Sequence, residues 1–447
     1  MFTKMAKILI SSLGTGKLEK NNTSTREYTK TVYRFQGSDK EYKTPFVATA
    51  LSEHLQVDKL YLVGTSKSMW EEVYNYFATV SNQTLDYDYW VKLGEKVASF
   101  KVGKDKINEN DLAKVNKAID GYLKYLRASA SGGSHCYIID YGLNETELWS
   151  NFDVFMGMGE ELEENDEIFL DITHAFRSIP LFNYLMLDLV GILKFKNNIK
   201  LAGLFYGMLE AISEMGYAPI VDLSPLYNIT LWTRGAYNFI NFGNGYLLAN
   251  LINDDSISKK IGNISDIVNI NYIDDFKREI DGLNHLLKNN EPSEPVVKYM
   301  QPYLKSFING FKGISSNGKL QISLAKWYFE NKRFAHGYIC LAESIITKIL
   351  EIYRERDPKI KWDQNSRNKV KKLIFKLRQI PEYKKINEEY LNIRNIRNRI
   401  AHAGFSDKKT FKEDIDNAYT YLSNVERYVF NNKALQKLPE EFLFSQL

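Results

Sequence analysis

The first half of the chain alternates short runs of β-branched and aliphatic residues with longer stretches of helical periodicity. The runs predict strands over residues 7–10, 59–63, 136–141, 167–171 and 200–206, and a short edge strand over 219–223. Helices are predicted between them, over residues 45–54, 68–80, 110–127 and 180–195. Strands that alternate with helices predict a mostly parallel, doubly wound sheet of the Rossmann-like α/β class. In such a sheet, ligands bind beyond the carboxyl ends of the strands.

The organisation changes near residue 225 and the strand pattern stops after about residue 231, so the rest of the chain is predicted to be all-α. Helical periodicity covers residues 231–252, 265–288, 295–311, 318–331, 335–355, 365–379, 384–401 and 409–431. Linkers rich in Pro, Gly, Ser and Asn separate these helices. We therefore predict an α/β domain over residues 1–228 and a helical region over residues 229–447.

The composition is that of a globular protein without a disulfide framework. The 447 residues are 44% hydrophobic and 26% charged, which excludes a disordered or fibrous chain. The two cysteines, Cys136 and Cys340, cannot build a disulfide scaffold or a cysteine-based zinc site. The sequence carries no leader-peptide pattern, and its longest apolar stretch, residues 181–195, is too short to cross a bilayer. We expect a cytoplasmic protein with no membrane partner.

The net charge of +4 hides a basic segment. Residues 359–402 contain 13 Lys or Arg and 4 Asp or Glu. This concentration of charge indicates a local site for a polyanion such as nucleic acid. A solvated helix face would have the same composition, so the segment by itself does not decide between the two.

The familiar nucleotide-binding motifs are absent. Residues 14–17 resemble the end of a P-loop, but Ser11 stands where the first Gly is required and Leu18 stands where Ser or Thr should bind magnesium. What remains is a loop of small residues at 11–16 after the first strand. Its backbone N–H groups could hold an anion, or it could be a plain strand-to-helix turn.

A stronger pattern follows the strand predicted at 167–171. The stretch DITHAFRSIP, residues 171–180, places Asp171, Thr173, His174 and Arg177 at the carboxyl end of that strand. Arg177 could hold a phosphate through two parallel hydrogen bonds, and His174 could donate to a phosphate or a base edge. The alternative is a capped helix in which Asp171 and Arg177 pair with each other.

A third pattern lies in the basic segment, in RNIRNRIAHAG at residues 394–404. It contains Arg397, Asn398 and, four residues further, His402. On a regular helix Arg397 and His402 are about 140° apart. They can converge only if the helix bends near residues 401–404 or if the site is assembled from two chains. The alternative is a basic helix end that interacts favourably with the helix dipole.

These three patterns together resemble the effector ribonucleases of type III CRISPR systems. Such effectors join a CRISPR-associated Rossmann-fold (CARF) sensor to a HEPN nuclease domain. One branch carries the sensor signature D-x-T-H-x-x-R-x-x-P, which matches residues 171–180, and residues 141–145 also resemble that branch. The HEPN signature, Arg followed after four to six residues by His, matches Arg397 and His402, and residues 324–345 resemble a HEPN helix pair. One departure is Ala175, where the branch has Gly.

The resemblance implies a sensor and a nuclease in one chain, acting in antiviral defence. The sensor would bind a cyclic oligoadenylate as allosteric activator, with the tetra-adenylate favoured over the hexa-adenylate. A HEPN homodimer, or a higher oligomer, would then cleave single-stranded RNA without a metal ion or other cofactor, using the RNA 2′-OH as nucleophile. The expected activator-binding residues are Ser11, Ser12, Leu13, Gly14, Asp171, Thr173, His174 and Arg177.

The same resemblance implies roles for residues of the basic segment. His402 would act as acid or base, Arg397 would stabilise the pentacoordinate phosphate, and Asn398 would orient either group. Arg394 and Arg399 would bind RNA. No cluster of His, Asp and Glu at metal-ligand spacing is present in the sequence, so we expect no metal site.

Other functions stay open at this point. The chain could be a CARF-type sensor or regulator whose helical domain binds nucleic acid without cleaving it. It could instead be a nucleotide-metabolising enzyme with its chemistry in the α/β domain. The sensor could also degrade its own cyclic oligoadenylate.

Overall fold

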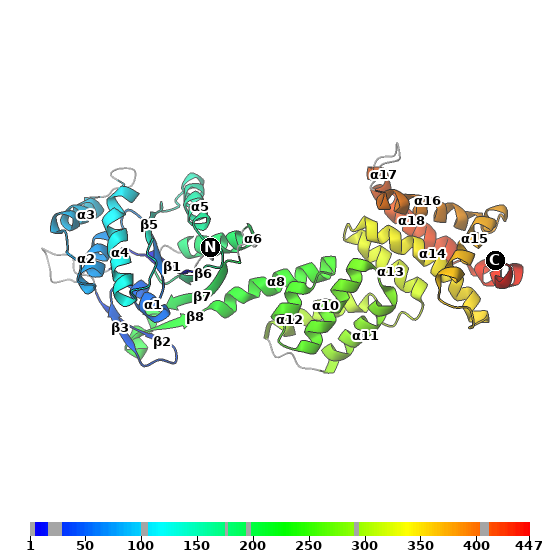
Figure 1. Ribbon diagram of the computed structural model, residues 1–447, viewed down its shortest axis with the longest axis horizontal. Coiled ribbons are helices and arrows are strands. Elements are labelled where there is room, and N and C mark those ends of the chain that lie inside the picture. The colour runs from blue at the N-terminus through cyan, green and yellow to red at the C-terminus, as the bar shows by residue number, and fades with distance from the viewer. Residues whose placement is uncertain are drawn as a thin grey trace. The chain divides into compact units, whose positions relative to one another are not determined.

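The chain folds into two compact units, residues 1–228 and 229–447. The structure is a computed structural model that describes residues 5–16, 29–99, 106–174, 178–193, 198–289, 295–402 and 411–447. Each unit has its own hydrophobic core. The predicted fold class is confirmed: a parallel-rich α/β unit is followed by a helical unit (Figure 1).

An eight-stranded sheet forms the centre of the first unit, in the order β3-β2-β8-β7-β6-β1-β4-β5. The strands are β1 Lys7–Leu13, β2 Thr31–Phe35, β3 Glu41–Thr44, β4 Lys59–Gly64, β5 His135–Ile138, β6 Glu167–Asp171, β7 Lys200–Gly207 and β8 Ala218–Asp222. Strands β7, β6, β1, β4 and β5 are mutually parallel, and so are β8 and β2. Only the β7–β8 and β2–β3 pairs of this sheet are antiparallel.

The sequence prediction was wrong at one side of this sheet. The strand predicted at 219–223 is β8, which lies between β7 and β2 and is not an edge. The β2–β3 hairpin that covers it was not predicted. Each of its strands is short and buries only alternate apolar residues: Tyr33 and Phe35 on β2, and Tyr42 on β3.

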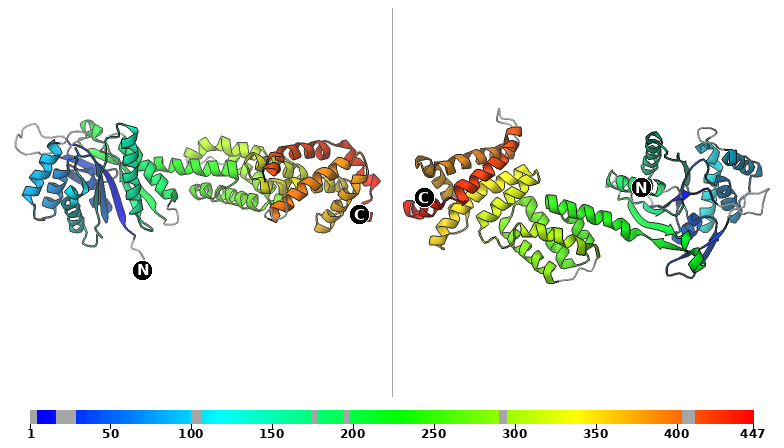
Figure 2. Two further views of the ribbon diagram at one scale, coloured as in Figure 1. Left: turned by 90° about the horizontal axis from the view of Figure 1, so that it is seen from above. Right: turned by 180° about the vertical axis from the view of Figure 1, so that it is seen from behind.

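Helices cover both faces of the sheet (Figures 1 and 2). They are α1 Val47–Leu55, α2 Trp70–Val80, α3 Tyr87–Ser99, α4 Ala113–Leu126, α5 Glu145–Glu160, α6 Ser178–Leu193 and α7 Ile212–Met215. Alternate residues of β1 point to opposite faces, so Leu9 and Leu13 belong to one core and Ile8 and Ile10 to the other. Helices α3 and α5 were not predicted.

The second unit is built entirely from helices within its described residues. They are α8 Ser224–Phe242, which begins in the first unit, α9 Tyr246–Leu251, α10 Asp255–Ile270, α11 Ile273–Asn289, α12 Pro295–Asn309, α13 Asn317–Glu330, α14 Phe334–Arg356, α15 Gln364–Lys376, α16 Lys384–Ala401, α17 Phe411–Asp416, α18 Ala418–Val425 and α19 Leu438–Glu441. The single helix predicted over 265–288 is two helices, because Asn271 ends α10 with a left-handed backbone, φ 60°. Helix α16 has the predicted bounds.

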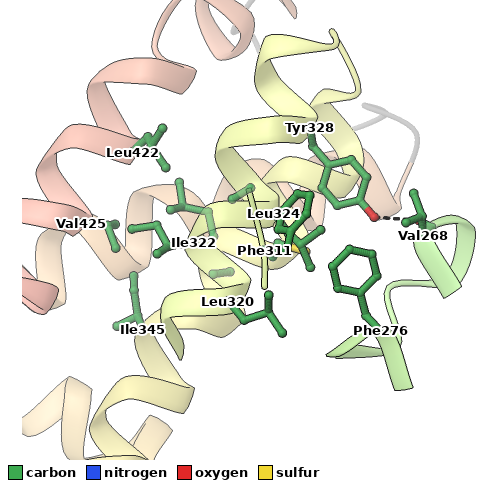
Figure 3. Close-up of a cluster of buried hydrophobic side chains, with 14 of the residues drawn as sticks. Val268, Phe276, Phe311, Leu320, Ile322, Leu324, Tyr328, Ile345, Leu422 and Val425 are labelled. Atoms are coloured by element: carbon green, nitrogen blue, oxygen red, sulfur yellow. Dashed lines mark hydrogen bonds between the residues drawn. The ribbon is translucent and has the colours of Figure 1, made fainter. Parts of the chain in front are cut away.

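The α13–α14 hairpin joins the two ends of this unit's core (Figure 3). On one side Ile322 of α13 and Ile345 of α14 lie with Leu422 and Val425 of α18. On the other side the Tyr328 hydroxyl donates to the Val268 carbonyl at 2.7 Å, which ties α13 to α10. The sequence stretch 324–345 therefore lies at the centre of the helical unit.

Candidate functional site

Asp171, the last residue of β6, ties three neighbouring strands together at their carboxyl ends. It is fully buried, and its Oδ2 accepts a hydrogen bond from Ser11 Oγ of β1 at 2.5 Å. Its Oδ1 accepts from both the N–H and the Oγ1 of Thr173, at 2.9 and 2.5 Å. Thr173 Oγ1 in turn accepts from the Gly207 N–H of β7 at 2.7 Å. Asp171 therefore holds the loop that follows β6 in a defined position.

A cavity of about 400 Å³ opens beside this loop. It is lined by Leu13, Gly14, Gly16, Thr29, Thr31, Tyr33, Pro45, Met69, His174, Leu209 and Ile212. The hydroxyl of Tyr33 lies 3.4 Å from Nε2 of His174, inside the cavity. The Gly14 carbonyl accepts from the Met69 N–H at 3.2 Å, which holds the loop after β1 against the start of α2. The cavity thus lies where a doubly wound sheet binds its ligands.

Burial governs the ionisation of the pair at this cavity. It raises the pKa of Asp171, an effect opposed by His174 and by the hydrogen bonds from Ser11 and Thr173. It lowers the pKa of His174, an effect opposed by Asp171. His174 therefore enters the cavity as a neutral imidazole at neutral pH, able both to donate and to accept a hydrogen bond.

A second group of polar side chains lies near the end of α16. Nε of Arg397 is buried and has no hydrogen-bond partner among the described residues. The helix stays regular to Ala401, and His402 caps it, with its N–H donating to the Asn398 carbonyl at 2.9 Å. Because no bend precedes residue 402, Arg397 and His402 remain on different faces of α16. Residues 403 and 404, where a bend was also expected, lie outside the described residues.

The two neighbouring arginines have different surroundings. Arg399 forms an ion pair with Asp414 of α17. The Tyr338 hydroxyl donates a hydrogen bond to the backbone carbonyl of the same Asp414. The guanidinium of Arg394 lies over the ring of Phe375, 5.7 Å from its centroid. Arg399 therefore fastens α16 to α17, whereas Arg394 packs on an aromatic ring that is 40% exposed.

Among the described residues, no three His, Cys, Asp or Glu side chains come together as a group that could hold a metal ion. None of the helices in the described part of the chain combines the length and the apolar character needed to cross a membrane.

Comparison with known proteins identifies the first unit. Residues 8–210 match the family described as CRISPR system endoribonuclease Csx1, CARF domain, and residues 228–316 match the one described as CRISPR-associated protein MJ1674, second domain. Over 430 residues the chain is 40% identical to CRISPR-associated protein MJ1674 of Methanocaldococcus jannaschii, which covers 94% of this chain. The chain belongs to the CRISPR-associated CARF proteins. The family resemblance read from the sequence is thereby confirmed.

The chain spans 66% of the length of the Methanocaldococcus relative. A solved structure, Enterococcus italicus Csm6 bound to cyclic hexa-2′-fluoro-hexa-dAMP, aligns over 99% of this chain and 98% of that one, with 13% identity and a TM-score of 0.39. That TM-score is too low to establish a common structure.

The CARF cavity brings together only part of the predicted activator-binding set. Leu13, Gly14 and His174 line it. Ser11 and Ser12 do not, because β1 pairs with β4 as far as Leu13 and so extends three residues beyond the predicted strand. They are buried in the sheet, 1% and 2% exposed. The expectation that they line the pocket is corrected: Ser11 supports Asp171, and Ser12 lies 3.5 Å from Nδ2 of Asn183.

The remaining predicted residues of the CARF loop have different outcomes. Asp171 and Thr173 lie behind the cavity and position His174. Arg177 and Ala175 lie outside the described residues, and so does the alternative pairing of Asp171 with Arg177. Tyr33 and Thr31 also line the cavity but were not predicted, because the apolar pattern of β2 is too short to indicate a strand. Their alternation with buried Phe35 along β2 was the available signal.

Proposed function

We propose that this CARF protein is a cyclic-oligoadenylate-activated endoribonuclease that cleaves single-stranded RNA without a metal ion, in type III CRISPR antiviral defence. One observation carries the nuclease proposal. A buried arginine donor, Nε of Arg397, has no partner among the described residues and lies near the end of a basic helix that also carries Asn398 and His402. An unpaired buried donor is costly unless a ligand supplies an acceptor. A phosphate oxygen is the acceptor that arginine binds best.

The proposed chemistry uses the RNA's own nucleophile. His402 takes the proton from the 2′-OH or gives one to the leaving 5′-oxygen, and Arg397 stabilises the charge that develops on the pentacoordinate phosphate. Asn398 orients the phosphate or the imidazole. The 2′-oxygen bonds to phosphorus while the bond to the 5′-oxygen breaks, which leaves a 2′,3′-cyclic phosphate or its hydrolysed 3′-phosphate.

We propose that the activator binds in the CARF cavity of a homodimer. A cavity of about 400 Å³ lies in the range of small-ligand sites. A cyclic ligand of even symmetry suits a two-fold axis, on which each protomer holds half of the ring. The tetra-adenylate is favoured, with the hexa-adenylate as the alternative. Activation acts by changing how two α16 helices meet in the dimer.

One assay tests the function. The purified chain is incubated with end-labelled single-stranded RNA in EDTA, with and without cyclic tetra- or hexa-adenylate. Cleavage that requires the cyclic activator and persists in EDTA supports the proposal. Activity that EDTA abolishes and magnesium restores would refute metal independence, and RNA binding without cleavage would identify a binding regulator instead.

A second candidate activity rests on the contact between Tyr33 and His174. A neutral imidazole and a phenol hydroxyl, 3.4 Å apart, face the proposed ligand. Such a pair could transfer a proton during cleavage of the cyclic oligoadenylate itself. The test is loss of labelled activator in the presence of His402→Ala, in which the α16 site is disabled. Undiminished activator after prolonged incubation would rule this activity out.

A further inference from the structure

One face of α16 carries a cluster of charge beyond Arg397. Tyr390, Arg394 and Arg397 recur at i, i+4 and i+7 and so lie on one side of the helix. This side faces α14 and α15, which supply Glu343 and Arg367. Burial raises the pKa of Tyr390, and so does Glu343, whereas Arg394, Arg397 and Arg367 oppose the rise. The carboxylate and the three guanidinium groups therefore all influence the buried hydroxyl of Tyr390.

The charges of this cluster do not balance. Glu343 forms an ion pair with Arg367, whose Nη1 also donates to Thr347 Oγ1 at 3.3 Å. The side chains of Arg367 and Glu343 keep 21% and 24% of their surface exposed, so the pair is accessible from solvent. Three arginines and one carboxylate thus act on Tyr390, and Nε of Arg397 has no acceptor among the described residues. These four side chains together carry an excess of positive charge, which an anionic ligand would offset.

Beside the arginines lies an aromatic ring with a solvent-accessible surface. Phe375 of α15 is 40% exposed, although it is a large apolar side chain. Its ring packs edge-on against Tyr390, with centroids 6.4 Å apart, and the guanidinium of Arg394 lies 5.7 Å from its centroid. Two neighbours on α16 thus hold the ring in place. A fixed, exposed ring next to cations is the arrangement on which proteins stack the bases of single-stranded nucleic acids.

We propose that Phe375, Arg394 and Arg367 form a subsite for one nucleotide of single-stranded RNA next to Arg397. The base stacks on Phe375, and the guanidinium groups of Arg394 and Arg367 bind the adjoining phosphodiester. This subsite rests on the proposed function and extends it, because it describes how the RNA substrate is held next to Arg397. RNA binding at the subsite can nevertheless be measured without any RNA cleavage.

The stacking half of the proposal is tested in full-length His402→Ala, which binds RNA without cutting it. The probe is a single-stranded RNA that carries 2-aminopurine, whose fluorescence is quenched when the base stacks. Adding Phe375→Ala should weaken RNA binding by roughly 5- to 100-fold, the usual effect of removing one stacking ring, and reduce the quenching. Phe375→Leu should lose the quenching too, whereas Phe375→Tyr should keep both.

The matched control is Tyr299→Ala. Tyr299 is 75% exposed on α12, in the same helical unit but outside the basic segment. The control should leave affinity and quenching unchanged. If Phe375→Ala behaves like Tyr299→Ala, the subsite is refuted even if the wild-type chain cleaves RNA. If Phe375 governs binding but the wild-type chain never cleaves, the subsite stands and the nuclease proposal fails.

The phosphate half predicts a change in salt dependence. Each phosphate contact with a single strand contributes about 0.7 to the slope of log affinity against log salt concentration. Arg367→Gln should reduce that slope by about this amount. The control is Arg356→Gln. Arg356 lies at the end of α14 and pairs with Glu440, so its removal should leave the slope unchanged. Equal slopes in the two variants would overturn the assignment of Arg367.

Discussion

At the scale of single residues, buried polar groups decide which side chains can reach a ligand. Asp171 uses both carboxylate oxygens on Ser11 and Thr173, so it supports the CARF loop and does not face the cavity. His174, three residues further, lines the cavity. In the helical unit Arg397 is partly buried, and its Nε has no partner within the part of the chain that the structure describes, so it can still bind a ligand.

Thr173→Val tests the role of the CARF hydrogen-bond network. The substitution keeps the β-branched shape but removes the hydroxyl that donates to Asp171 and accepts from Gly207. Leaving those buried groups unsatisfied should cost about 1–3 kcal/mol in the free energy of unfolding. Differential scanning calorimetry of the full chain measures this loss. Thr173→Ser, which keeps the hydroxyl, should remain close to wild type; an equally stable Thr173→Val would show that the network does not stabilise the loop.

Glu389 on α16 offers a prediction with a defined pH dependence. Glu389 is 8% exposed, and its Oε2 has no partner among the described residues. Burial raises its pKa in the folded state, an effect opposed mainly by the hydrogen bond from Asn424. The charged form is therefore disfavoured by folding, a cost that exists at neutral pH and disappears below about 4.5, where the carboxyl is protonated in both states.

Glu389→Gln should accordingly raise the melting temperature at pH 7, by about 2 °C, because an unpaired amide costs less to bury than an unpaired carboxylate. The gain should shrink as the pH is lowered through 4.5. Glu388→Gln is the control: hydrogen bonding to Lys385 lowers the pKa of Glu388, so its removal should not stabilise the protein. A Glu389→Gln gain that is constant with pH would contradict this account.

At the scale of elements, helix α6 and strand β2 shape the CARF unit beyond its sheet core. Strand β2 brings Tyr33 to the cavity through its parallel pairing with β8. Helix α6 buries Met186 and Val190 against the sheet but exposes Leu181, Leu185 and Ile192 by 59%, 52% and 50%. These three recur at i, i+4 and i+11, which places them in one stripe.

The exposed stripe of α6 supports the proposed homodimer, and Leu185→Glu tests it. A charge at the centre of an apolar interface should shift the protein toward the monomer, as measured by light scattering on a sizing column. Activator affinity should fall with it, because the ring needs both protomers. Leu143→Glu, at a residue 70% exposed outside any helix or strand, is the control. A Leu185→Glu variant that stays dimeric would place the interface elsewhere.

At the scale of the whole molecule, the sites proposed for sensing and for cleavage lie in different compact units. His174 belongs to residues 1–228, and His402 belongs to residues 229–447. The two proposed functions can therefore be addressed by separate substitutions, one in each unit.

Two substitutions should separate the functions. His174→Ala should weaken activator binding and shift the activator dose for RNA cleavage upward by roughly tenfold, with much of the maximal rate recovered at saturation. Arg177→Ala should behave in the same way. His402→Ala should bind activator fully but lower RNA cleavage by about 100-fold or more. Calorimetry and a cleavage gel measure both; a folded His402→Ala that loses activator binding would refute the two-site arrangement.

The sequence by itself determined the features that depend on local pattern. Periodicity located six strands of the sheet, because buried parallel strands are short continuous apolar runs. It also located most of the helical unit, and α16 to the residue. The cluster of Asp171, Thr173 and His174 was found because residues that end a strand are close in the chain as well as in space. The family resemblance followed from the same motifs.

Only the tertiary structure decided which of those residues line the cavity and which are buried beside it. Ser11 is a small polar residue in a predicted loop, but the pairing of β1 with β4 through Leu13 buries it beneath Asp171. Strand β2 buries too few apolar residues to stand out in sequence, and it forms because β8 and β3 pair with it. The juxtaposition of Phe375 with Arg394 joins two helices whose contact no spacing reveals. Contacts between distant segments depend on packing, and packing is a property of the whole fold.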